Sequence, residues 1–90
     1  MSIAHASDII AVWTEQGRPT RIVWRGTRYV VTDTPTPLTR PAIHDALTHP
    51  LLQVSGWRFQ GASMGPGAEV RMFDVRRVGG DNWELIDTYR

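Results

Sequence analysis

Apolar and polar residues alternate along the first third of the chain, in the period of two that places successive side chains on opposite faces of a β-strand. The same pattern returns in the second half, between glycine-containing turns. The segments are rich in β-branched and aromatic residues, which is typical of strands. They comprise residues 8–15, 20–25, 28–32, 56–62, 69–78 and 82–89.

A β-hairpin is predicted around Gly26-Thr27, because two β-rich segments separated by two residues, glycine first, are typical of a type II′ turn. In that register Arg25 lies opposite Arg28, and the pairs that follow are Trp24–Tyr29, Val23–Val30 and Ile22–Val31. Since successive side chains alternate, the predicted core face carries Ile22, Trp24, Tyr29 and Val31. The other face carries Arg21, Arg25 and Arg28 around Val23 and Val30.

The middle of the chain has a different pattern. Residues 33–40 are interrupted by prolines and are predicted to form an extended connector. Residues 41–49 fit a short helix that begins at Pro41 and ends before Pro50. Further on, in residues 69–78, the apolar positions change phase, which indicates a bulge or bend near Met72.

These elements predict an α+β domain that is mainly β: about six short antiparallel strands form a curled sheet or small open barrel. The one short helix is inserted between the third and fourth strands. Ninety residues suit a single domain, with residues 1–7 flexible and residues 33–55 forming the connector and helix. All eight aromatic residues fall within predicted strands, which assigns most of them to the core. The alternative is a base-stacking platform, which requires one or two of them, such as Trp57 or Trp83, to be exposed.

The composition excludes several classes of site. The chain has no cysteine, which rules out disulfides and thiolate metal sites. The spacing of His5, His44 and His49 does not bring two of them onto one metal, so neither a metal nor a cofactor is predicted. The N-terminal residues show no basic region followed by a long apolar stretch, and we expect a cytoplasmic protein that does not bind membranes.

Catalytic motifs are absent or out of context. Residues 61–65 (GASMG) match the G-x-S-x-G pattern of serine hydrolases, but Pro66-Gly67 cannot open the helix that this motif needs, which favours a turn. Asp81, Glu84 and Asp87 are close in sequence, but alternation along a strand points Glu84 away from the other two. The chain is therefore predicted not to be an enzyme.

Charge is distributed unevenly along the chain. All ten basic residues are arginine, and nine acids leave a net charge of only +1. The stretch from Gln16 to Thr32 contains no acid and four arginines, which are Arg18, Arg21, Arg25 and Arg28. The planar guanidinium suits phosphate, so a hairpin with arginines on one face and aromatic neighbours favours contact with nucleic acid. Two other interpretations stay open. The choice of arginine over lysine can reflect the codons of a GC-rich genome, or the arginines can pair with acids on neighbouring strands, such as Asp74 or Glu84.

Two stretches resemble a bacterial family of small β-rich domains of unknown function. The first is G-R-P-x-R-I-x-W-R-G-x-x-Y-x-V from Gly17 to Val31, and the second is F-x-V…W-x-L-x-x-x-Y from Phe73 to Tyr89. Members of that family occur alone or as a terminal module on relatives of translesion DNA polymerases. The resemblance implies a DNA-repair context and a module that binds rather than reacts. The middle of the chain departs from the family pattern, and the family has no established catalytic residues to carry over.

The predicted function is a non-catalytic binding module that contacts nucleic acid, or another anion, through Arg21, Arg25 and Arg28, with Arg18 and Arg58 as additional contacts. The alternative is a protein-interaction or homodimerisation module, which would use an exposed sheet edge or an apolar patch around Val23, Val30 and the Leu51-Leu52 segment. The choice depends on whether the face that carries Val23 and Val30 is open to solvent.

Overall fold

The computed structural model describes residues 8–42 and 51–90, and the regular structure within these residues consists of seven β-strands. The strands are β1 (Ile9–Glu15), β2 (Arg18–Trp24), β3 (Thr27–Val31), β4 (Thr36–Ala42), β5 (Leu51–Ser63), β6 (Val70–Gly79) and β7 (Asn82–Tyr89). The mainly β prediction is confirmed, but the described part of the chain contains no helix, so the class is all-β rather than α+β. In particular, the described residues include no helix long and apolar enough to cross a bilayer.

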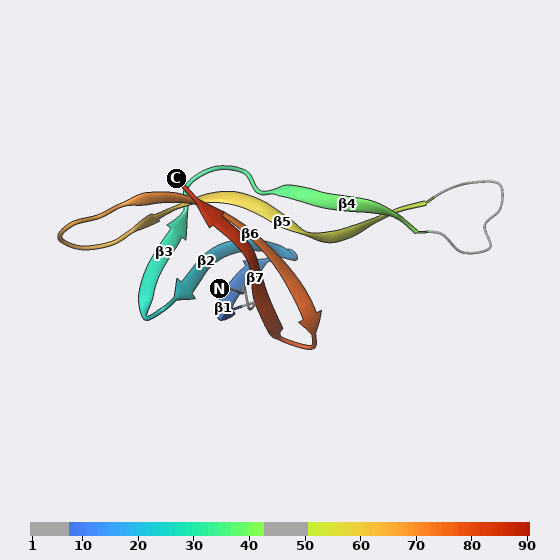
Figure 1. The fold of residues 1–90 in the computed structure, drawn as a ribbon, viewed down its shortest axis with the longest axis horizontal. Coiled ribbons are helices and arrows are strands. Elements are labelled where there is room, and N and C mark those ends of the chain that lie inside the picture. The colour runs from blue at the N-terminus through green and yellow to red at the C-terminus, as the bar shows by residue number, and fades with distance from the viewer. Residues whose placement is uncertain (1–7, 43–50) are drawn as a thin grey trace, which may run out of the picture.

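Six of the strands form a closed antiparallel barrel (Figure 1). Their order is β3-β2-β1-β7-β6-β5, and a ladder between β3 and β5 joins the two ends of the sheet. This closing ladder pairs Tyr29 with Ser63, Val30 with Ala62 and Val31 with Gly61. The predicted curled sheet is therefore a barrel without free edges of its own, because β3 and β5 satisfy each other's backbone groups.

The β2–β3 hairpin is present, but its register differs by one residue on each strand from the predicted one. Trp24 pairs with Thr27, so the turn consists of Arg25 and Gly26. Both have positive φ, 51° and 79°, which is the pattern of a type I′ turn and not of the predicted type II′ turn. Arg25 thus lies in the turn and not opposite Arg28. Because both strands shift together, the strand side chains keep their predicted faces.

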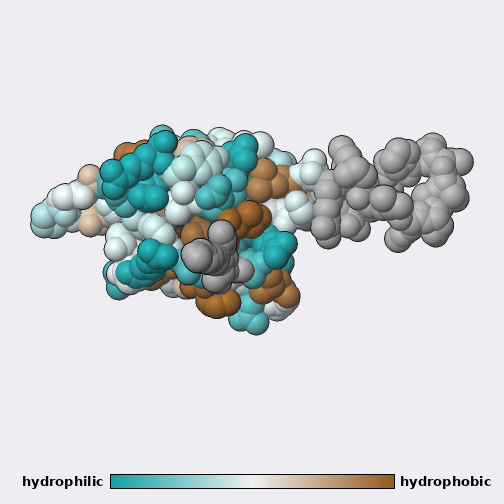
Figure 2. Space-filling view, in the orientation of Figure 1, coloured by the Kyte–Doolittle hydropathy of each residue, from teal (hydrophilic) through white to brown (hydrophobic). Residues whose placement is uncertain are grey.

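The barrel interior is filled by aromatic and aliphatic side chains, which are Ile10, Ile22, Tyr29, Phe59, Phe73, Val75, Trp83 and Leu85. The Phe73 ring is central: its centroid lies 4.9 Å from that of Tyr29 and 5.8 Å from that of Phe59. The core assignment is confirmed for most aromatic residues, whereas Trp13 and Tyr89 are exposed. On the face in view in Figure 2, hydrophilic and hydrophobic residues are interspersed, as expected where strands alternate.

The seventh strand, β4, lies outside the barrel and pairs with β5 (Figure 1). The extended conformation predicted for residues 33–40 is confirmed from Thr36 onward, and the pairing with β5 is an addition to it. The helix predicted over residues 41–49 is wrong at its first two residues, Pro41 and Ala42, because they end β4. Its remainder lies outside the described residues, as do residues 1–7, which were expected to be flexible.

A register shift in β6 explains the phase change in its sequence. Phe73, Asp74 and Val75 are buried in succession, which strict alternation does not allow. The ladder with β7 shifts between Asp74 and Val75, because Ile86 is an additional residue on the partner strand. The bend predicted near Met72 is therefore two residues further along the chain.

β5 passes from the outer β4–β5 ribbon into the barrel at Gly56. The ladder with β4 shifts there, because Ser55 is an additional residue between the partners of Leu38 and Thr39. Gly56 also approaches β6 closely: a Cβ atom built on it would lie 2.2 Å from the carbonyl oxygen of Val75. Any side chain would collide with backbone at this point, so the local path of β5 requires glycine.

We expect Gly56→Ala to destabilise the fold by about 3 kcal/mol, because the added methyl group forces β5 away from β6. Chemical denaturation followed by circular dichroism measures the loss. Gly61→Ala is the matched comparison and should cost less, since its Cβ would meet the Phe73 ring at 3.1 Å and not a backbone atom. Equal stability of Gly56→Ala and the unmodified chain would contradict the required close approach.

Candidate functional site

The outer faces of β1, β2 and β3 carry part of the arginine surface that the sequence predicts. Across these strands Trp13 pairs with Arg21 and Arg21 with Val30, while Val23 pairs with Arg28 in the next row. A hollow of about 450 Å³ lies over this surface. We call it the hairpin groove, and its lining residues are Trp13, Arg21, Ile22, Val23, Arg28, Tyr29, Val30 and Met64.

The hairpin groove places an indole ring next to two guanidinium groups. Trp13 is 47% exposed, and the guanidinium carbon of Arg21 lies 5.9 Å from the centroid of its ring, at the outer limit of a cation–π contact. Arg28 is exposed on the adjacent strand. The described residues that line the groove include no acid, so the positive charge is not neutralised within it.

Arg25 does not line the hairpin groove, because it lies in the β2–β3 turn and forms an ion pair with Asp8, the residue before β1. Its Nε donates to Oδ2 of Asp8 at 3.1 Å, and the same oxygen accepts a hydrogen bond from Nε1 of Trp24 at 2.9 Å. The guanidinium carbon lies 4.9 Å from the centroid of Trp24. Arg25 therefore helps to hold the turn against the start of β1.

Arg58 is held by a buried acid on the neighbouring strand. Its Nε donates to Oδ1 of Asp74 at 2.8 Å and its second terminal nitrogen donates to Oδ2 at 3.0 Å, which makes a bidentate pair. Asp74 is 7% exposed and lies opposite Asp87 in the β6–β7 ladder, so the guanidinium also offsets repulsion between two carboxylates. The hydrogen bond to Asp74 raises the pKa of Arg58. Asp74, one of the acids considered as a partner for the four arginines between Gln16 and Thr32, therefore pairs with Arg58 instead.

Arg18 lies in a different place again. It lines a hollow of about 370 Å³ beside the β1–β2 turn, together with the acids Glu15 and Asp33. Glu15 is also its partner across the ladder. Of the five arginines predicted to act together, the structure brings only Arg21 and Arg28 to the hairpin groove.

A polar network surrounds the hydroxyl of Tyr29, which donates to Oε2 of Glu69 at 2.7 Å. The other oxygen of Glu69, Oε1, accepts a hydrogen bond from Arg90 at 2.8 Å, and Nη1 of Arg71 lies 3.7 Å from Oε2. Burial raises the pKa of Tyr29, and the hydrogen bond to Glu69 adds to that effect. The same hydrogen bond lowers the pKa of Glu69, with a further contribution from the positive charges of Arg90 and Arg71.

Ser63 and Glu84, from the two sequence motifs interpreted as non-catalytic, form hydrogen bonds or ion pairs with neighbouring residues. Ser63 of the G-x-S-x-G match ends β5, and its Oγ accepts a hydrogen bond from the backbone N–H of Glu69 at 2.8 Å across the β5–β6 turn. Glu84, the other acid considered as a partner for the arginines between Gln16 and Thr32, forms an ion pair with Arg76 instead. No cluster of acids within the described residues could hold a metal ion, and the three histidines lie outside those residues.

Two members of the hairpin groove were not identified from the sequence. Strand membership assigns Trp13 to the core, but Ile10 and Val12 occupy the inward positions of β1, so Trp13 points outward. Because side chains alternate along a strand, the inward apolar positions 10 and 12 were the signal that could have placed Trp13 on the outer face. Met64 is 67% exposed and reaches the groove because β3 pairs with β5, a long-range contact that no local pattern encodes.

No protein-family model, curated protein or solved structure matches this chain. The resemblance to the bacterial family of small β-rich domains therefore stays a prediction. The function has to be inferred from the chemistry of the chain's own surfaces.

We expect Arg58→Gln to lower the stability of the fold. The substitution leaves the buried carboxylate of Asp74 next to Asp87 without its partner. Asp74→Asn should also destabilise, and the double variant should recover part of the loss of Arg58→Gln, because no unpaired charge remains. Denaturation midpoints of the four proteins measure this coupling. Strictly additive losses would contradict it.

We expect Tyr29→Phe to lower the denaturation midpoint at neutral pH by an amount that shrinks in acid. Because the pKa of Glu69 is lower in the folded chain, its contribution to the free energy of unfolding is fully present above pH 4.5, its ordinary pKa. That contribution disappears as pH falls through the folded pKa. The pKa of Tyr29 is raised instead, so its contribution is present below 10.0 and disappears as pH rises through the folded pKa. A pH series of denaturation midpoints measures both limits. Tyr89→Phe, at an exposed ring, is the control and should show neither dependence.

Proposed function

We propose that this protein is a non-catalytic module that binds single-stranded nucleic acid in the hairpin groove. The observation that carries the proposal is the exposed ring of Trp13 beside the guanidinium groups of Arg21 and Arg28, with no acid among the described lining residues. A base stacks on the indole, and the two arginines contact the phosphates on either side of it. This combination is the one that proteins use to bind single strands with little sequence preference.

A single strand fits the groove better than a duplex. The face of Trp13 can accept a base only if that base is unstacked from its neighbours, and duplex bases are not. Two arginines on adjacent strands also make a small set of phosphate contacts, so we expect weak, salt-sensitive binding. The DNA-repair context comes from the resemblance alone, and it is consistent with a module that recognises exposed single strands.

A protein partner on the same groove is the second candidate. Val23 and Val30 are half-buried and line the groove with the exposed Met64, so they offer apolar contact area beside Trp13. Tryptophan and arginine are also enriched in protein interfaces. Edge pairing is less favoured, because β3 and β5 close the barrel and β4 carries prolines that cannot donate to a new ladder. The side chains of Leu51 and Leu52 lie outside the described residues.

We expect Trp13→Ala to weaken binding of a labelled single-stranded oligonucleotide about tenfold, because one stacked base is lost. Arg21→Gln combined with Arg28→Gln should reduce the slope of log K against log salt by about 1.4, the value for two phosphates on a single strand. Fluorescence anisotropy at several salt concentrations measures both quantities. Arg18→Gln removes a charge outside the groove and should change the affinity much less.

Several outcomes would count against the proposal. Absence of binding at low salt would remove it, and so would equal effects of Arg18→Gln and Arg28→Gln, since binding would then follow net charge alone. Static light scattering at high concentration tests the second candidate in its homodimer form. A dimer that dissociates on Trp13→Ala would assign the groove to self-association instead.

A further inference from the structure

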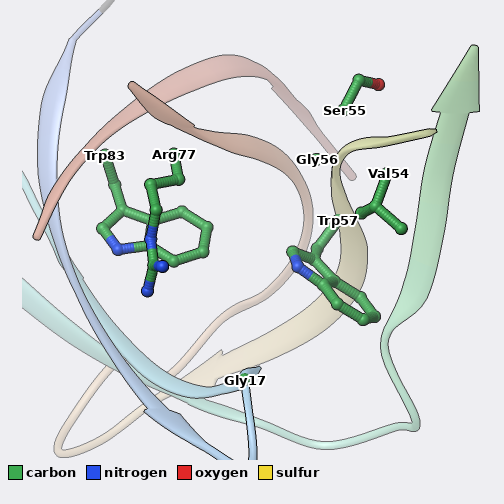
Figure 3. Close-up of a pocket in the computed structure, with 7 residues that line it drawn as sticks. All are labelled: Gly17, Val54, Ser55, Gly56, Trp57, Arg77 and Trp83. Atoms are coloured by element: carbon green, nitrogen blue, oxygen red, sulfur yellow. The ribbon is translucent and has the colours of Figure 1, made fainter. Parts of the chain in front are cut away.

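A smaller hollow of about 210 Å³ lies at one end of the barrel, away from the residues of the hairpin groove. It is bordered by the β1–β2 turn, by the ends of β6 and β7 next to their connecting turn, and by the part of β5 that enters the barrel (Figure 3). We call it the end pocket, and its lining residues are Gly17, Val54, Ser55, Gly56, Trp57, Arg77 and Trp83.

Two indole rings form the walls of the end pocket. Figure 3 shows Trp57 and Trp83 on opposite sides of the hollow, with the nitrogen-bearing ring of Trp57 turned toward Trp83. Trp57 is half-buried, whereas Trp83 is 4% exposed and belongs to the core. Flat apolar walls of this kind favour a planar ring, which can pack against an indole face or edge. The volume equals that of about seven liquid water molecules, which suits a single ring with a small substituent.

The polar side-chain groups at this pocket that lack a partner are all hydrogen-bond donors. Within the described residues neither Trp57 nor Trp83 has a hydrogen-bond partner for its indole N–H, although Trp83 is almost fully buried. Buried donors nearly always have a partner in the protein, in ordered water or in a ligand. By contrast, Trp24 donates its indole N–H to Asp8. Both rings therefore have a donor that the described residues leave unused, and Figure 3 shows that of Trp57 on the edge of its ring that faces Trp83.

Arg77 gives the pocket its charge. Its guanidinium carbon lies 5.2 Å from the centroid of the Trp83 ring, and Figure 3 shows the side chain extending alongside that indole. Among the described residues Arg77 forms no ion pair, whereas its neighbour Arg76 is paired with Glu84. A cationic ligand is disfavoured, because a cation already lies over the Trp83 ring and the described residues that line the pocket include no acid.

We propose that the end pocket binds a small ring-shaped anion. The planar ring lies between Trp57 and Trp83, and a carboxylate or phosphate substituent accepts hydrogen bonds from Arg77 and from the indole N–H of Trp57. The proposal goes beyond binding in the hairpin groove, because it concerns a free small molecule and a set of residues that shares no member with the groove.

The four tryptophans make a direct test, since each indole N–H gives one signal in a proton–nitrogen correlation spectrum of the full chain. Trp→Phe variants at each position assign the signals. The probes are phenyl phosphate and benzoate, each compared with a neutral counterpart, phenol and benzyl alcohol. We expect the Trp57 and Trp83 signals to move with the anions while the Trp24 signal, held by Asp8, stays in place. The anionic probe should bind at least about tenfold more tightly than its neutral counterpart. Binding of one anion and not the other would support the site and identify its substituent.

Two variants connect the affinity to the named residues. Arg77→Gln should abolish the preference for the anionic probe, and Trp57→Ala should abolish binding, with melting curves confirming that both variants fold. Arg28→Gln removes the same charge in the hairpin groove and should leave the titration unchanged. Unmoved Trp57 and Trp83 signals at millimolar concentrations of all four probes would overturn the proposal, as would equal affinity for anionic and neutral probes. The Trp13 signal reports oligonucleotide binding separately, so the groove and the end pocket can fail independently.

Discussion

The ladder between β3 and β5 is the constraint on which the other features of this barrel depend. It places Val31 opposite Gly61, where the absence of a side chain lets the Phe73 ring pack against the strand. Closure at this point brings the hydroxyl of Tyr29 to Glu69 and Met64 to the edge of the hairpin groove. These contacts of β3 with the second half of the chain exist because the sheet closes, whereas the β1–β7 ladder joins the two halves on the other side of the barrel. A core this small depends on every strand that encloses it.

The same closure divides the arginines by role. Arg58 and Arg76 pair with acids on adjacent strands. Arg25 and Arg71 each form a cation–π contact with the Trp24 ring. These cations have partners that limit what else they can bind. Among the described lining residues, neither the groove that holds Arg21 and Arg28 nor the pocket that holds Arg77 contains an acid. The net charge of +1 conceals this division, because Asp8, Glu69, Asp74 and Glu84 form ion pairs with arginines outside the groove and the pocket.

Much of the local structure could be predicted from residue patterns. The inward positions of β2 and β3 follow from alternation, and they held although the turn is formed by Arg25 and Gly26 and the register moved by one residue on each strand. The strand character of residues 36–42 was harder to predict, because Pro37 and Pro41 indicate a connector. Prolines are tolerated here because β4 is an edge strand that pairs, among the described strands, only with β5. A base-stacking platform would need Trp57 or Trp83 to be exposed, but Trp57 is half-buried and Trp83 is buried. Arg77 had no signal of its own.

The sequence by itself determined which side chains share a face in the regular parts of the strands and, to within a residue, where the hairpin turn falls, because both depend on neighbours a few residues away. Only the tertiary structure decided that the sheet closes, that Asp74 holds Arg58, and that Trp13 lies beside Arg21 and Arg28 in an open groove. These are contacts between distant segments. They depend on the order of the strands in the sheet and on the volume that the core must fill. Neither can be predicted from a local pattern of residues.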